Sequence, residues 1–108
     1  MDTGLYIANF RTPLDDAKGV IYITHDGRVY GGDSGMYYTG EVGGADTALR
    51  VRMTVVNHDP TRLSVFGEFD QFNLTLNGKR KGEEYVFEGR ADAAPSIRFS
   101  AVLKKVTD

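Results

Sequence analysis

Apolar and polar residues alternate along most of the chain, and this alternation predicts β-strands. In the clearest segment, 47–56, every second residue is apolar: Leu49, Val51, Met53 and Val55. A period of two places these side chains on one face of a strand and the polar residues between them on the other. Segments 71–77, 85–90 and 97–104 repeat the pattern. Strands of this kind are typical of antiparallel sheets, which bury one face and expose the other.

Short turn sequences separate the alternating segments. Asp26-Gly27 is a hairpin signal between 20–24 and 28–31. Further turns are predicted at Gly43-Gly44, at Lys81-Gly82 and at Ala93-Ala94-Pro95. With 4–10 and 37–42 added, the chain contains eight predicted strands within one domain, residues 1–108.

Eight short strands joined by hairpins predict an all-β, antiparallel up-and-down barrel, because closure removes both edges of the sheet. A two-sheet sandwich is the alternative architecture. A barrel of this size holds either side chains or one small ligand. The residues expected to point inward are bulky, which indicates a filled interior: Tyr6, Phe10, Met53, Phe72, Phe87 and Phe99. The longest connection, 58–70, mixes polar and large apolar residues, and we expect a short helix near residues 60–68, or an irregular cap, over one end.

The composition narrows the classes of function. The chain has no Cys, which excludes disulfides and thiolate metal sites. Its net charge of −2 disfavours direct binding to nucleic acid, for which a strongly basic face is expected. The N-terminus does not resemble a signal peptide, and no apolar run approaches the roughly 20 residues that cross a membrane. We therefore expect a cytoplasmic protein that does not bind membranes.

One segment imitates an enzyme motif. Gly31, Gly32, Asp33, Ser34 and Gly35 contain the GDSG of chymotrypsin-like proteases, and His25 lies upstream. A catalytic triad also needs a third group, an oxyanion hole and a cleft, and those proteases use two barrels. A glycine-bent turn in which Asp33 and Ser34 bond their own backbone is the simpler interpretation. His25 and His58 are interpreted as exposed turn residues, so we expect no catalytic residue, metal or cofactor.

The outer face of the predicted barrel offers a surface for association. If Tyr6 and Ile21 point inward, apolar neighbours on the same strands point outward. Closure of the barrel brings the last strand beside the first, and the predicted outer stripe is Leu5, Ile7, Val20, Tyr22, Val86 and Val102. Contiguous exposed apolar patches usually mark association. The alternative is that the long connection folds over the stripe.

The first part of the chain resembles the GrlR-like family, negative regulators of bacterial type III secretion systems. The matching features are an ordered series of glycines and aromatic residues: Gly4-Leu5-Tyr6, Gly19-Val20-Ile21, Gly27, Gly31-Gly32-Asp33, Tyr38 and Gly40. The resemblance implies a lipocalin-like eight-stranded barrel that forms a homodimer and binds a transcriptional activator. It implies no catalysis and no cofactor.

One departure from the family concerns partner recognition. The family's regulator has an acidic Glu-Asp-Glu-Asp run after the strand that contains Gly40. The corresponding loop here, Gly43, Gly44, Ala45 and Asp46, has a single acid. We therefore expect a non-enzymatic regulatory protein that acts by protein–protein contact without this electrostatic device. A carrier of small apolar ligands in the barrel interior is the alternative, and a hydrolase using Ser34 is a third hypothesis.

Overall fold

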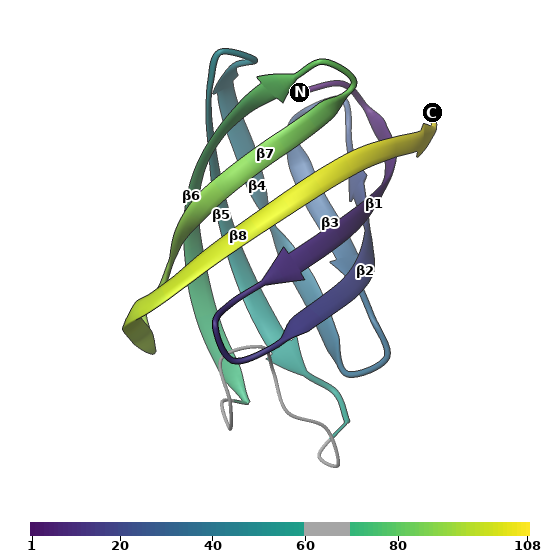
Figure 1. Ribbon diagram of the computed structural model, residues 1–108. Helices are drawn as coiled ribbons and strands as arrows, with labels where there is room; N and C mark the ends of the chain where they lie inside the picture. Colours follow the sequence, from purple (N-terminus) through teal and green to yellow (C-terminus); the bar gives the residue numbers. More distant parts are fainter. Residues whose placement is uncertain (60–69) are drawn as a thin grey trace.

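Eight antiparallel strands close into a barrel in the computed structural model, which describes residues 1–59 and 70–108 (Figure 1). Each strand pairs with its neighbours in sequence, and β1 pairs with β8 to close the sheet. The strands are β1 Gly4–Arg11, β2 Asp16–Ile23, β3 Arg28–Gly32, β4 Met36–Ala45, β5 Ala48–Asn57, β6 Gln71–Lys81, β7 Glu84–Ala91 and β8 Ala94–Thr107. The predicted up-and-down barrel is confirmed, and the sandwich alternative is wrong. The helix expected near residues 60–68 lies outside the described residues.

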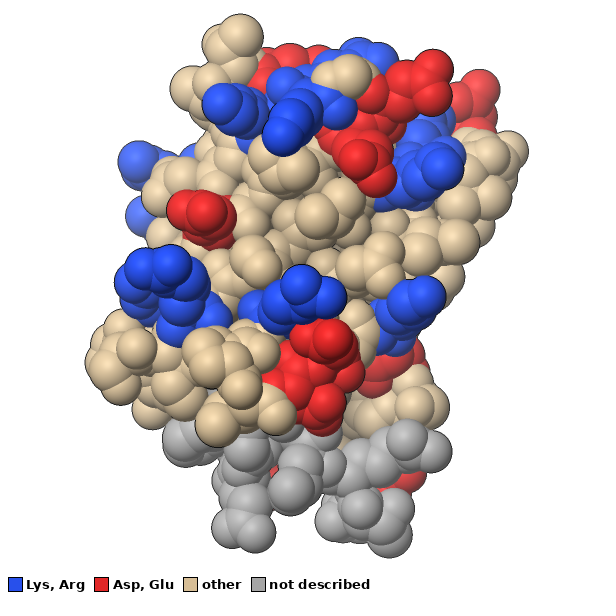
Figure 2. All heavy atoms as spheres, in the orientation of Figure 1, with Lys and Arg blue, Asp and Glu red and all other residues tan. Residues whose placement is uncertain are grey.

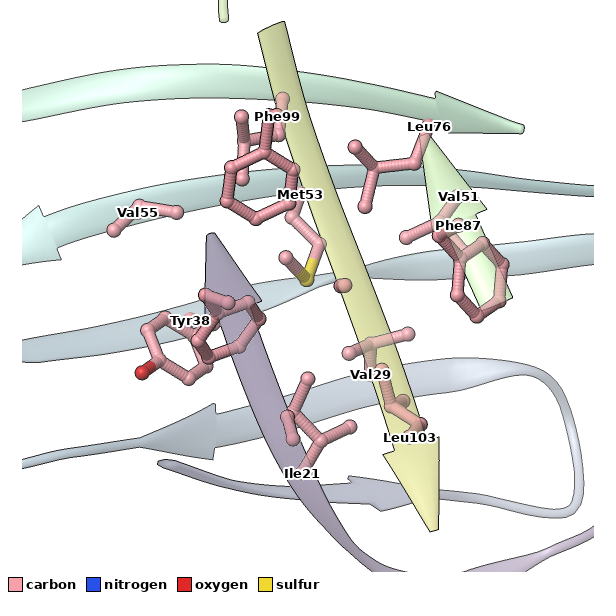
Figure 3. Close-up of a cluster of buried hydrophobic side chains, with 14 of the residues drawn as sticks. Ile21, Val29, Tyr38, Val51, Met53, Val55, Leu76, Phe87, Phe99 and Leu103 are labelled. Atoms are coloured by element: carbon pink, nitrogen blue, oxygen red, sulfur yellow. The ribbon is translucent and has the colours of Figure 1, made fainter. Parts of the chain in front are cut away.

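The barrel interior is filled with side chains. The inward set predicted from the alternation is buried, since Tyr6, Phe10, Met53, Phe72, Phe87 and Phe99 are each at most 6% exposed. In Figure 3, Phe99 of β8, Met53 of β5 and Leu76 of β6 point into the same interior space. An interior cavity of about 20 Å³ lies among these core side chains. A space of that size holds about one water molecule.

Two turns lie elsewhere than the sequence predicts. Gly43 and Gly44 belong to β4, and the turn that follows is at Asp46-Thr47. Ala94 and Pro95 belong to β8, and the turn before them is at Asp92-Ala93. Pro95 is tolerated because it is the second residue of its strand, beside a register shift in β7, where its missing N–H interrupts no ladder. A hairpin lies where Asp26-Gly27 predicts it, but its loop has three residues, 25–27, because the N–H of Thr24 donates to the carbonyl of Arg28. Gly27 has the positive φ of +81° that its turn requires.

Candidate interaction surface

A cluster of exposed apolar side chains covers the outside of β1, β2 and β3. The strand register places Leu5 opposite Tyr22, and Tyr22 opposite Tyr30. In the next outward row, Ile7 lies opposite Val20. Ile7, Val20 and Tyr22 are 44%, 48% and 39% exposed. We call these five residues the tyrosine patch.

Tyr30 is the member of the tyrosine patch that the sequence analysis missed. It is 48% exposed and follows the buried Val29 in β3. The predicted two-residue turn at Asp26-Gly27 would pair Ile23 with Tyr30. The loop has three residues, 25–27, and this shift pairs Tyr22 with Tyr30 instead. Tyr37 of β4, 46% exposed, was also missed. It lies opposite Gly32, which is itself opposite Val20.

The other two residues of the predicted stripe form a separate group. Val86 and Val102 lie directly opposite each other on β7 and β8, and both are only partly exposed. Asn9 lies beside Val102, whereas Ile7 of the tyrosine patch pairs with Lys104. The stripe therefore divides into the tyrosine patch and a valine pair, of which Val102 lies diagonal to Ile7 of the patch. The two valines lie in an outward row across five strands, which we call the valine row: Lys18, Asn9, Val102, Val86 and Lys79.

Two surface grooves run along the valine row. One, of about 470 Å³, crosses β2, β1 and β8; the other, of about 680 Å³, crosses β8, β7 and β6. Ser100 and Val102 line both grooves, so the two meet over β8. Figure 2 shows this face, where a mostly uncharged band, with an acidic side chain at its left, lies between charged side chains near the upper end and a second charged group below.

The GDSG segment forms a turn built around Asp33. Its Oδ1 atom accepts hydrogen bonds from the backbone N–H groups of Gly35 and Met36, both at 2.8 Å. The hydroxyl of Tyr38 donates to Oδ2. Burial, together with this hydrogen bond, raises the pKa of Tyr38 well above its ordinary range. Asp33 therefore has the predicted turn function, while Ser34 is exposed.

The structure brings His58 to this turn, a contact that the sequence analysis missed. The Nε2 atom of His58 lies 3.0 Å from the carbonyl oxygen of Asp33 and donates to it. Its ring stacks on Tyr37 at a centroid distance of 6.4 Å. Because that nitrogen donates to a backbone carbonyl, it is not placed to take a proton from Ser34. The arrangement supports a structural function, rather than a catalytic one, for His58 and Ser34.

Asp46, the single acid of the loop at the family's acidic position, is engaged within the molecule. Its Oδ1 atom lies 3.1 Å from the α-amino group of Met1, and its Oδ2 atom lies 3.6 Å from the guanidinium of Arg80. The hydrogen bond to the amino group is the main cause that lowers the pKa of Asp46. Arg80 also lies over the ring of Tyr85 at 5.7 Å. This acid is paired before any partner arrives.

Within residues 1–59 and 70–108, no group of three or more His, Cys, Asp or Glu side chains is placed to hold a metal ion. The same residues include no helix that is long and apolar enough to span a membrane. No protein-family model matches the chain, and no curated protein matches it significantly.

Proposed function

We propose that this protein is a non-enzymatic regulator that acts by protein–protein contact, and that it forms a homodimer through the tyrosine patch. The observation that supports the proposal is the patch itself, in which five apolar side chains adjoin on three strands and four of them are more than a third exposed. Tyrosines are enriched in protein interfaces, where the ring is buried and the hydroxyl keeps a hydrogen bond. Exposed apolar clusters of this kind usually mark association.

The resemblance to the GrlR-like regulators points to the same class of function. In that family a barrel dimer binds a transcriptional activator, and we propose an activator or a comparable regulatory protein as the partner here, within the cytoplasm. Control of type III secretion is the pathway that the resemblance suggests. The paired state of Asp46 favours a partner site elsewhere than the loop 43–46.

The carrier alternative is less well supported by the barrel interior. The cavity of about 20 Å³ is far below the several hundred Å³ of ordinary small-molecule pockets. An apolar ligand would have to displace side chains such as Phe99 and Met53, which are at most 4% exposed. Displacing closely packed core side chains is costly. The crowded interior thus favours the outer surface as the place where this protein acts.

Light scattering after size-exclusion chromatography tests the dimer. We expect the parent protein to have twice the chain mass of 11.9 kDa, and Ile7→Lys and Val20→Lys to have the mass of one chain. A buried lysine in a dimer core loses its hydration without gaining a partner, which dissociates the dimer. Thr75→Lys, an exposed outward residue of β6, is the control and should stay dimeric. A parent that is monomeric at every concentration would refute the homodimer.

A further inference from the structure

We infer that the groove along the valine row binds an extended peptide segment of a partner protein, with an acidic residue at each end of a short apolar stretch. This inference rests on the proposed function, because it names the chemistry of the partner. It concerns a different surface from the tyrosine patch. The evidence is the order of side chains in the row, the shape of the groove and its charge.

The valine row is apolar in its centre and basic at both ends. From β2 to β6 its members are Lys18, Asn9, Val102, Val86 and Lys79. Both lysines are exposed, and no ion pair to either is seen within the described part of the chain. Four steps between neighbouring strands separate them, a span of about 19 Å. An extended chain covers that distance with about six residues.

The groove is a narrow trench between two outward rows. The second row is Asp16, Arg11, Ser100, Glu88 and Asn77, and every residue of both rows lines one of the grooves. The positions between the rows point into the barrel and supply the floor: Ala17, Phe10, Ala101, Phe87 and Gly78. Two residues along a strand correspond to a trench about 7 Å wide. An α-helix, 10–12 Å across, is too wide to enter it, whereas an extended segment fits.

The charge of the groove favours an acidic partner. Four basic residues line it, namely Arg11, Lys18, Lys79 and Arg90, against the two acids Asp16 and Glu88. Arg11 is already paired with Asp16 at 3.1 Å, which leaves Arg90 and the two row-end lysines for a ligand. The groove therefore has a local excess of positive charge, although the whole chain has a net charge of −2. Complementary charge at both ends orients a partner and speeds its association.

The groove is less suited to a polyanion. A nucleic acid or an anionic membrane is recognised by a broad basic surface. Here Glu88 lies within the trench, and the lysines are confined to its ends. Two valines at the centre would face a sugar–phosphate backbone without a favourable contact. We therefore assign the groove to a peptide.

Fluorescence anisotropy tests the inference. The probe is a labelled peptide about seven residues long, with Asp at both ends, Val at alternate inner positions and Thr between them. We expect saturable binding that weakens with salt, because exposed charges are screened. Lys18→Glu/Lys79→Glu should weaken binding by about tenfold or more, since each lysine then repels a carboxylate. Val102→Thr, which keeps the shape but adds a hydroxyl, should also weaken it.

Matched controls distinguish the groove from general charge attraction. Arg52→Glu, an exposed outward residue of β5 outside the groove, should bind the probe as the parent does. Probes with Asn in place of Asp, or Ser in place of Val, should bind weakly. Thermal unfolding of each variant checks that it is folded, and Lys79→Gln gives a milder variant of the same site.

The outcomes separate this inference from the dimer. The inference is overturned if the peptide does not bind the parent saturably. It is also overturned if Arg52→Glu weakens peptide binding as much as Lys18→Glu/Lys79→Glu does. Equal competition by a single-stranded oligonucleotide or by anionic vesicles also overturns it, since either would show binding of polyanions in general. Ile7→Lys should be monomeric and should still bind the peptide as the parent does. Peptide binding by a monomeric parent would refute only the dimer.

Discussion

At the scale of single residues, the absence of a side chain at Gly40 lets β4 lie close to β5. A Cβ atom at this position would lie 2.0 Å from the carbonyl oxygen of Arg52 and 2.8 Å from the Cα of Met53. Both contacts are with backbone, which cannot move without disturbing the sheet. Gly43 on the same strand has no heavy atom within 4 Å of the corresponding position. Neither residue has a positive φ, so close contact alone distinguishes them.

Alanine substitutions should therefore act in opposite directions at these two glycines. We expect Gly40→Ala to lower the free energy of unfolding by about 1–3 kcal/mol, because overpacking forces backbone shifts. Gly43→Ala should raise it by about 0.4–1 kcal/mol, because alanine has fewer unfolded conformations to lose. Urea unfolding of both variants measures the difference. Equal effects at the two positions would contradict the close approach of β4 and β5.

At the scale of elements, the turn between β7 and β8 is tied to the start of β6. The Oδ1 atom of Asp92 accepts the backbone N–H of Asn73 at 2.9 Å, and its Oδ2 atom accepts the Asn73 side-chain amide at 3.1 Å. The backbone N–H of Asp92 donates to the Asn73 carbonyl at 3.0 Å. Thr54 of β5 donates to the Asn73 side chain. One carboxylate thus connects a hairpin turn to two further strands.

Replacing this carboxylate should destabilise the barrel in a pH-dependent way. The hydrogen bond from the Asn73 backbone is the main cause that lowers the pKa of Asp92 below its usual 3.8. The stability it adds is therefore present above 3.8 and lost as the pH falls through the lower, folded-state pKa. We expect Asp92→Asn to lower the Tm at neutral pH, as measured by circular dichroism.

The difference in Tm between parent and Asp92→Asn should shrink in acid, where the parent carboxyl is protonated too. Glu83→Gln, which changes an exposed carboxylate in the turn between β6 and β7, is the control and should leave the Tm unchanged. A difference in Tm that persists undiminished in acid would mean that Asp92 acts through its shape rather than its charge.

At the scale of the whole molecule, closure of the barrel decides how it can associate. β1 and β8 pair along seven residues, so each of the eight described strands has a paired strand on both sides. A partner therefore finds no strand that is free along a whole side, and its main contacts must be with outward side chains. This is the physical reason that the tyrosine patch and the valine row, both on sheet faces, are the surfaces to test.

The filled barrel should also lose stability in alkali. Burial raises the pKa of the Tyr6 hydroxyl, which donates to the Asp2 carbonyl at 2.6 Å, and burial likewise raises the pKa of Tyr38. In the folded state burial keeps these hydroxyls neutral, whereas in the unfolded state they lose their protons above the ordinary pKa of 10.0. The unfolded state is therefore stabilised relative to the folded state as the pH rises above that value. We expect the free energy of unfolding to fall as the pH rises above that value.

Tyr38→Phe tests the source of this alkaline sensitivity. The variant should be less stable at neutral pH, because Asp33 loses a hydrogen bond, yet its stability should fall less steeply in alkali. Tyr30→Phe, which removes an exposed hydroxyl, should keep the parent's pH dependence. Urea unfolding at several alkaline pH values measures both. Identical pH dependence in Tyr38→Phe and the parent would count against the buried hydroxyl.

Local features of the sequence were sufficient to predict the strands, the barrel and its core. Side-chain direction alternates residue by residue, so Leu49, Val51, Met53 and Val55 identified a buried face without knowledge of the partners. The glycines behind the family resemblance, such as Gly31 and Gly40, have the same local cause, because a Cβ at either would lie within 2.2 Å of a neighbouring carbonyl oxygen. These two glycines therefore meet a steric requirement of the closely paired strands.

Register and closure decided what the sequence left open. They pair Tyr22 with Tyr30, separate Val86 and Val102 from the tyrosine patch, and bring His58 to Asp33. They also bring Asp46 beside Arg80, so that this acid is ion-paired within the molecule. Each contact joins residues that lie on different strands or directly beside their ends, and its existence depends on the register between those strands. Alternation along one strand reports which face a residue occupies, and only the closed sheet determines its neighbours on that face.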